Sequence, residues 1–361
     1  MAKVRCAIIG CGGIANGKHM PSIKAVGRAD MVAFCDIIRE KAVSAAERYG
    51  TEGAKIYTDY HELLKDESID VCYVLTPNRS HADITCDCLN AGKHVLCEKP
   101  MAKTAEDAKR MVETAKKTGK LLTIGYQHRH KPESQYIKAL IDRGDLGEIY
   151  YAKALAIRRR GTPNWGVFLN EYEQGGGPLI DIGTHSLDLT LYLMNNYEPR
   201  MVVGTSYKKV ENPECGNPWG GWGKDENTTL EDAAFGFVVM KNGATITLDA
   251  TWALNTSLPI QEGSTQLCGS KAGAEIINNK VVINKGEFGR LVDSHPDMSV
   301  GGVAFYDGVK ETPAITEQRR FMDAVEFGAE LVVKPEQACV VSQILEAIYT
   351  SAKSGKPVFF D

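Results

Sequence analysis

The chain has 361 residues, more than one hydrophobic core usually serves, so its length predicts two domains. Apolar residues make up 43% and charged residues 24% of the sequence, and the net charge is −4, as in ordinary globular proteins. The longest basic run, Arg158 to Arg160, is too short to indicate nucleic-acid binding. No apolar run reaches membrane-spanning length. We therefore expect neither nucleic acid nor a membrane as a partner.

Most of the ten cysteines sit inside apolar, strand-like runs, among them Cys6, Cys35 and Cys72. This placement predicts small buried side chains in a reducing compartment. No cysteine or histidine cluster has the spacing of a metal site, so no metal is predicted. The N-terminus leads directly into a strand and leaves no room for a signal peptide, which predicts a cytoplasmic location.

The first 125 residues alternate short β-branched runs with helical segments, which predicts βαβ units around a parallel sheet with helices on both faces. Gly50 is expected to end one helix, and Thr104 with Asp107 has the spacing of a helix N-terminal cap. The strand-like runs are VRCAIIG, MVAFCD, KIYTD, DVCYVL, HVLCEKP and LLTIG.

After Gly125 the rhythm changes to longer strands with few helices, and two of these strands join across Lys241-Asn242-Gly243, a hairpin signal. Two helices, near 317–328 and 336–354, end the chain. These features predict an α+β domain with a large, mostly antiparallel open sheet. Residues 212–229 are rich in Gly, Pro and Trp and form either a lid or a surface excursion. The predicted domains are 1–128 and 129–361.

The stretch Gly10 to Ala15 matches G-x-G-x-x-A between a predicted strand and helix, the pattern of a dinucleotide-binding turn. Its glycines permit a tight turn and close approach to a pyrophosphate, and the helix N-terminus faces the anion. Asp36 ends the next strand and would accept a hydrogen bond from the ribose 2′-hydroxyl of NAD, whereas it would repel the 2′-phosphate of NADP. NAD is therefore favoured, although Arg39 nearby leaves NADP open. The cofactor-binding residues predicted here are Gly10, Gly12, Gly13, Ile14, Ala15 and Asp36.

The stretch GGGPLIDIGTHSLDL, from Gly175 to Leu189, places Asp181 and His185 one helical turn apart in an apolar run. A histidine suits the role of a general base because it titrates near neutral pH. The alternative is a buried histidine satisfied by a helical neighbour. The glycines ahead of the helix are expected to let the chain pass close to cofactor or substrate.

Four segments in register carry a family resemblance: GCGGIA, LTPNRSH at 75–81, CEKPMA at 97–102 and GGGPLIDIGTHSLD at 175–188. Together they resemble the glucose–fructose oxidoreductase / inositol dehydrogenase / rhizopine catabolism protein family across nearly the whole chain. The resemblance implies an N-terminal Rossmann domain and an α+β C-terminal domain.

The resemblance also implies roles for individual residues. It places Thr76, Pro77 and Asn78 at the cofactor with His81, which could equally be a structural residue at a helix start. It presents Lys99 toward nicotinamide and substrate, where a lysine at a strand end would stabilise an alkoxide, while Glu98 anchors the turn. Asp181 and His185 match the family's Asp-x-x-x-His pair. The residues expected to contact substrate are Lys99, Tyr126, Arg158, Trp165, Asp181 and His185. Arg158 and Trp165 are included because they end a strand just before the helix of Asp181 and His185, and the equal alternative for them is a solvated edge with a buried Trp165.

These observations predict an NAD-dependent oxidoreductase that moves a hydride between nicotinamide and a hydroxyl-bearing carbon of a sugar, sugar derivative or cyclic polyol. Lys99, Asp181 and His185 are the predicted catalytic residues. Two alternatives stay open, an NAD-dependent glycosidase acting by transient oxidation and a non-catalytic NAD-binding sensor. A homodimer or homotetramer is expected from the family.

Overall fold

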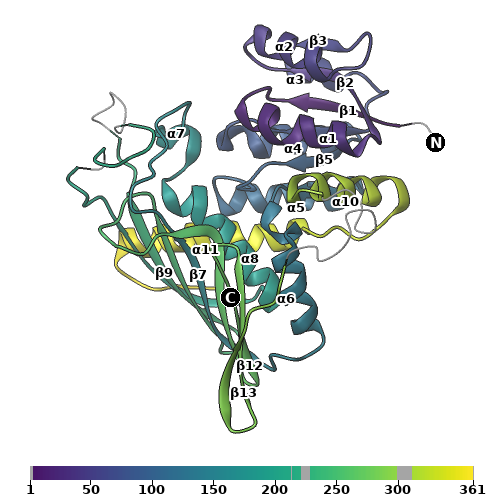
Figure 1. Cartoon of the computed structure of the whole chain (residues 1–361). Helices are drawn as coiled ribbons and strands as arrows, with labels where there is room; N and C mark the ends of the chain where they lie inside the picture. Colours follow the sequence, from purple (N-terminus) through teal and green to yellow (C-terminus); the bar gives the residue numbers. More distant parts are fainter. Residues whose placement is uncertain (1–2, 213, 221–227, 299–310, 361) are drawn as a thin grey trace. The chain divides into compact units, whose positions relative to one another are not determined.

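The computed structural model describes residues 3–212, 214–220, 228–298 and 311–360 (Figure 1). It divides into two compact units, Met1–His130 with Glu311–Cys339, and Lys131–Lys310 with Val340–Asp361. The segment 311–339, which the sequence analysis places in the second domain, therefore packs with the first unit. No helix in the described ranges is long and apolar enough to cross a membrane.

The first unit is built on a six-stranded parallel sheet in the order β3-β2-β1-β4-β5-β6. Its central strands are almost wholly buried, as expected where helices cover both faces. The strands are β1 Val4–Ile9, β2 Ala29–Cys35, β3 Lys55–Tyr57, β4 Val71–Val74, β5 His94–Cys97 and β6 Leu122–Ile124. The helical segments are η1 Ala15–His19, α1 Met20–Val26, α2 Arg39–Tyr49, α3 Tyr60–Leu64, η2 Asn78–Ser80, α4 His81–Asn90, α5 Ala105–Thr118, η3 Gln127–His130 and α10 Pro313–Phe327.

Local signals predicted several ends of these elements correctly. The Thr104 hydroxyl accepts from the Asp107 amide at 3.1 Å and caps α5, and Gly50 ends α2. No local sequence signal indicated that the helix α10 would pack with the first unit. Phe321 and Met322 complete the core beneath β1 and α1, a contact that links residues about 300 positions apart and is invisible to local patterns.

The second unit contains a nine-stranded sheet in the order β14-β13-β12-β11-β7-β10-β9-β8-β15. Among the described strands of this sheet, β7 and β10 are the one parallel pair, and β9 and β10 form the hairpin predicted at Lys241-Asn242-Gly243. The strands are β7 Ile149–Ile157, β8 Pro199–Tyr207, β9 Ala233–Met240, β10 Thr245–Thr251, β11 Ile260–Gly269, β12 Ala272–Ile277, β13 Lys280–Glu287, β14 Arg290–Ser294 and β15 Val358–Phe359. The helices are α6 Pro132–Asp142, α7 Glu171–Gln174, η4 Leu179–Gly183, α8 Thr184–Met194 and α11 Pro335–Ser354.

This architecture confirms the predicted fold class, a parallel α/β domain and a second domain with a large, mostly antiparallel sheet. One face of the second sheet is covered by helices: α8 packs on β7 and β11, and Ser186 donates to the Leu155 carbonyl at 2.7 Å. Ile348 of α11 lies against Gly204 and Gly236 on the same face. The alternate residues of each strand therefore lie on the opposite face.

Candidate active site

The glycine-rich turn follows β1 and leads into a helical run that begins at Gly13. Gly10 has φ of +94°, and a Cβ there would lie 2.6 Å from the Leu75 carbonyl oxygen, so glycine is required for the chain to pass the end of β4. Gly12 and Gly13 differ, since a Cβ on either would meet no described atom within 4 Å. That open space at a helix start suits a pyrophosphate, which needs close approach to backbone amides.

Asp36 follows β2 and lies beside this turn. One carboxylate oxygen accepts from the Cys11 amide at 2.9 Å and the other from the Ile38 amide at 2.9 Å. A carboxylate offers about four acceptor positions, so Asp36 retains the capacity to accept ribose hydroxyls. Ile14 of the turn and Ile38, two residues after Asp36, are both exposed. Ala15 is fully buried, as expected for the position of the turn that must be small.

Two further turns lie at the carboxyl ends of β4 and β5, and His81 joins them. In its buried ring Nδ1 lies 2.8 Å from the Pro100 carbonyl oxygen and Nε2 lies 2.9 Å from the Thr76 carbonyl oxygen, and the neutral ring donates to one of the two, depending on its tautomer. Burial lowers the pKa of His81 below its usual value, even though both carbonyls oppose that shift. His81 thus fixes the turn 76–78 relative to the turn 98–100, which favours its structural interpretation.

Glu98 is buried and holds the second of these turns in place. Its Oε1 accepts from Lys18 at 2.8 Å and pairs with His19 at 2.7 Å, and its Oε2 accepts from the Lys99 amide at 2.9 Å. Burial opposes its ionisation, but Lys18 and His19 hold the pKa of Glu98 well below its usual value. Glu317 of α10 pairs with Lys18 at 3.0 Å, so the C-terminal segment braces the turn that carries half-buried Lys99.

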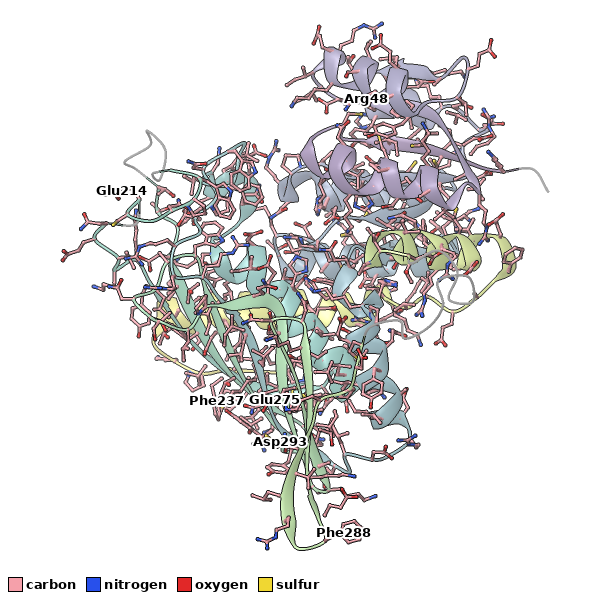
Figure 2. All side chains as sticks on the ribbon, in the orientation of Figure 1. Arg48, Glu214, Phe237, Glu275, Phe288 and Asp293 are labelled. Atoms are coloured by element: carbon pink, nitrogen blue, oxygen red, sulfur yellow. The ribbon has the colours of Figure 1, made fainter. Side chains whose placement is uncertain are left out.

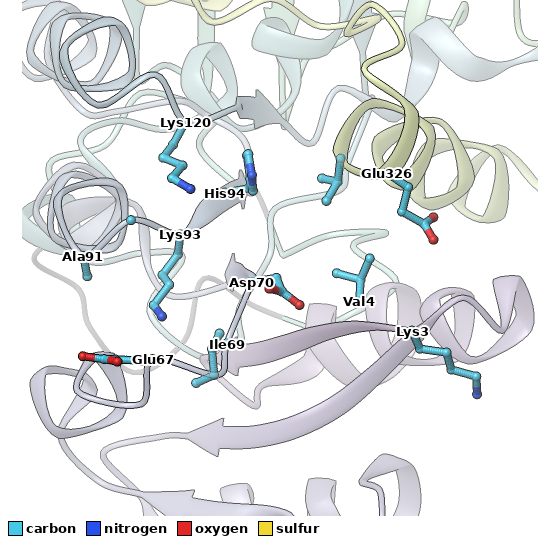
Figure 3. A pocket seen from close by; sticks show the side chains of 12 residues that line it. Lys3, Val4, Glu67, Ile69, Asp70, Ala91, Lys93, His94, Lys120 and Glu326 are labelled. Carbon is cyan, nitrogen blue, oxygen red and sulfur yellow. The ribbon is translucent and has the colours of Figure 1, made fainter. Parts of the chain in front are cut away.

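The cavity in Figure 3 lies at the opposite end of this sheet, where the amino ends of the strands meet. Its volume is about 710 Å³, and it is lined by residues at the amino ends of the strands, including Val4, Asp70, His94 and Lys120. Ligands of open parallel sheets bind at the carboxyl ends. This cavity is therefore separate from the predicted cofactor residues.

In the second unit, Asp181 lies on η4 and His185 on the first turn of α8. The Asp181 carboxylate accepts from the indole nitrogen of Trp252 at 3.0 Å, and Trp252 is fully buried. His185 is 7% exposed and sits among the apolar side chains of the helix. The predicted four-residue spacing is therefore present, and a rigid indole fixes one of the two side chains.

The start of this helical run is anchored by Glu231, a residue whose role the sequence did not reveal. Its carboxylate accepts from the Gly177 amide at 3.1 Å, from the Leu179 amide at 3.3 Å and from the Tyr349 hydroxyl at 2.7 Å. Burial raises the pKa of Glu231. The signal that the sequence offered was an acidic pair, Glu231-Asp232, directly before the apolar strand β9.

The glycines before the helix have a different purpose from the one expected. A Cβ at Gly176 would overlap the Tyr349 hydroxyl, and one at Gly177 would lie 2.6 Å from the Glu231 carbonyl oxygen. These two glycines accommodate the protein's own side chain and backbone at Tyr349 and Glu231, whereas the sequence predicted that they give room to cofactor or substrate.

The remaining predicted contact residues have mixed settings. Tyr126 is only 1% exposed. The Arg158 guanidinium donates to the Gly161 carbonyl at 2.9 Å and lies 3.3 Å from Glu262, and Trp165 is exposed. In the described parts of the chain, no group of three or more His, Cys, Asp or Glu side chains is arranged to hold a metal ion.

A six-stranded parallel sheet with this turn, followed by Asp36, is the architecture of a dinucleotide-binding domain. Residues 4–126 match the model of an oxidoreductase family with an NAD-binding Rossmann fold, and residues 138–360 match that family's C-terminal alpha/beta domain. The chain belongs to this family, which confirms the resemblance. It is an NAD-dependent oxidoreductase.

Individual relatives agree with this assignment. D-glucoside 3-dehydrogenase of Escherichia coli is 34% identical over 360 residues, covering 98% of this chain and 97% of that protein. Inositol 2-dehydrogenase of Salmonella paratyphi B is 36% identical over 146 residues, 40% of this chain and 43% of that protein. The crystal structure of aldose-aldose oxidoreductase from Caulobacter crescentus has the same fold, with a TM-score of 0.79, 24% identity, and coverage of 99% of this chain and 100% of that one.

Proposed function

We propose that this enzyme oxidises a secondary hydroxyl of a sugar, sugar derivative or cyclic polyol with NAD. The observation that carries the proposal is the similarity, along the full length of the chain, to a dehydrogenase of D-glucosides. Inositol 2-dehydrogenase, which is similar over part of the chain, extends the substrate class to cyclic polyols. The carbohydrate class is common to both relatives.

Bound NAD supplies a hydride acceptor, the nicotinamide ring. Gly12 and Gly13 would hold its pyrophosphate on backbone amides, and Asp36 would bind the ribose. Thr76, Pro77 and Asn78 would border the cofactor, with the turn kept in place by His81.

In the proposed reaction His185 takes the proton of the substrate hydroxyl while the carbon loses its hydride, and a ketone results. The Lys99 ammonium stabilises the negative charge that develops on the substrate oxygen. Asp181, fixed by Trp252, holds a neighbouring hydroxyl or orients His185. In the reverse direction His185 returns the proton to the carbonyl oxygen.

A panel of sugars, glucosides and inositols tested with NAD and NADP, with reduced cofactor followed by absorbance, tests this function. His185→Ala and Lys99→Ala should each lower kcat/KM by about 100-fold or more, within the range of general acid–base catalysis. The exposed residues His61 and Lys65 provide matched controls, since His61→Ala and Lys65→Ala should leave activity unchanged. Full activity in His185→Ala would contradict the mechanism, and glycoside cleavage without accumulation of NADH would support a redox-assisted glycosidase.

We also propose that the chain forms a homo-oligomer through the open face of its second sheet. Val203 and Phe237 are cross-strand neighbours on that face and are 36% and 43% exposed, and Tyr207 lies further along β8. Phe237 is labelled in Figure 2. An exposed apolar band on a sheet is stabilised by a second copy. Light scattering should show Phe237→Lys shifting the protein to monomer, while Phe288→Lys, at the tip of the β13–β14 hairpin, leaves the assembly intact.

A cytoplasmic location is proposed on separate grounds. All ten cysteines are free, and eight of them are buried. Free, buried thiols are typical of a reducing compartment. A mass measurement of the protein isolated under thiol-trapping conditions should find ten reduced cysteines.

A further inference from the structure

Two exposed tryptophans lie against each other in the second unit. Trp165 and Trp219 come from loops more than fifty residues apart in sequence and are 47% and 42% exposed. Their ring centroids are 4.9 Å apart at an interplanar angle of 75°, an edge-to-face pair. Large aromatic side chains left in contact with water are characteristic of binding surfaces.

The two loops are tied together by one buried and one exposed hydrogen bond. Asn217, 8% exposed, donates through Nδ2 to the carbonyl of fully buried Thr162 at 3.1 Å, and Asn164 donates to the Trp219 carbonyl. The Trp219 ring also receives the Arg158 guanidinium at 5.7 Å from its centroid. Because the surrounding structure fixes the rings, a ligand that stacks on them would not have to order them first.

Contacts within the same unit connect the pair to Asp181. Trp165 meets Phe168 edge-on at 5.6 Å, and Phe168 packs on the buried cluster that contains Ile182 and Trp252. Trp252 in turn donates to the Asp181 carboxylate at 3.0 Å. Phe168 and the buried cluster that contains Trp252 therefore lie between the exposed pair and Asp181 in this series of contacts.

We propose that Trp165 and Trp219 form a subsite for a second ring, attached to the oxidised sugar through its glycosidic oxygen. This inference rests on the proposed sugar oxidation and makes the substrate a glycoside with a ring-shaped aglycone. The flat face of a sugar or an aromatic ring stacks on indole, and Arg158 adds a hydrogen-bonding cation beside it. The shared chemistry is a planar ring face, carried either by a second sugar or by an aromatic group.

Steady-state kinetics of the full chain with NAD on three substrates tests the proposal. Methyl glucoside has no ring aglycone, cellobiose carries a sugar ring and phenyl glucoside an aromatic ring. Trp219→Ala and Trp165→Ala should each raise KM about 10-fold for a ring-bearing substrate and leave methyl glucoside within 2-fold. The distribution of this effect between cellobiose and phenyl glucoside identifies the aglycone. Trp219→Phe should retain part of the affinity, and Phe288→Ala, which changes an exposed aromatic residue elsewhere, should have no effect.

An equal rise in KM for methyl glucoside and for both ring-bearing substrates would overturn the subsite, because the pair would then contact the oxidised sugar itself. Wild-type protein that does not prefer a ring-bearing glycoside would also overturn it. If no substrate reduces NAD, the proposed function fails independently. In that case quenching of tryptophan fluorescence by phenyl glucoside in the presence of NADH would still support the aromatic subsite if it is lost in Trp219→Ala, where Trp165 remains as a reporter, and absence of quenching in the wild type would overturn it.

Discussion

Two glycines of one turn serve different purposes, and substitution should separate them. Gly10→Ala places a methyl group against the Leu75 carbonyl at a positive φ, so we expect a loss of about 2 kcal/mol or more in stability. Gly12→Ala points into open space and should keep the melting temperature but weaken NADH binding by about 10-fold, since the methyl group occupies the approach of the pyrophosphate. Thermal melts and NADH titrations of the two variants measure both effects. Normal NADH affinity in folded Gly12→Ala would contradict this assignment of the turn.

Trp252 is the residue on which the position of Asp181 depends. Trp252→Phe keeps most of the buried ring but removes the indole donor, leaving the carboxylate without that 3.0 Å partner. We expect kcat/KM to fall about 10-fold, with a changed pH profile that a purely structural role would not produce. The matched control is Tyr151→Phe, which also keeps an aromatic ring and removes a polar group, but one that contacts Thr247 and not Asp181. An unchanged pH profile in Trp252→Phe would contradict the role of Trp252 in positioning Asp181.

At the scale of elements, the helical run that carries Asp181 and His185 depends on its anchor at Glu231. Gly177→Ala would force a methyl group to within 2.6 Å of the Glu231 carbonyl oxygen. Overpacking of this kind costs about 1–3 kcal/mol and displaces the start of the run. Both the melting temperature and kcat/KM should fall. The control is Gly286→Ala in the exposed strand β13. A Cβ at Gly286 would meet no described atom within 4 Å, so this variant should change neither the melting temperature nor kcat/KM.

The first unit is completed by α10, and this arrangement sets a pH dependence of stability. His130 is buried near Arg320 and Arg319 of α10, and burial followed by these cations lowers its pKa to about 3. Its contribution to stability is complete above the unfolded value near 6.5 and is lost progressively as the pH falls from there toward 3. Between pH 7.5 and 5 the loss amounts to about 2 kcal/mol.

His130→Gln should remove this part of the acid sensitivity. Denaturant unfolding at pH 7.5 and at pH 5 gives the free energy of unfolding at each pH. Between the two, this free energy should drop less in His130→Gln than in wild type. The exposed His61 supplies the control, because His61→Gln should keep the wild-type drop. Equal drops in wild type and His130→Gln would show that the buried ring does not carry the effect.

The features of this protein that depend on residues close together in the chain were largely predictable from its sequence. Short apolar runs predicted the parallel strands because both faces of such strands are buried. The glycine pattern with Asp36 predicted the cofactor turn because few residues tolerate its geometry. The Asp181–His185 spacing predicted a helical pair because periodicity alone places residues four apart on one face.

The tertiary structure decided what depends on contacts between distant residues. Sequence could not show that α10 completes the first unit, that Glu98 is paired with Lys18 and His19, or that Trp252 binds Asp181, because each contact links segments 70 to 300 residues apart. The tertiary structure also showed that Gly176 and Gly177, ahead of η4 and α8, accommodate Tyr349 and Glu231. Local propensity specifies backbone conformation, whereas the partner of a buried charge is set only when the chain has folded around it.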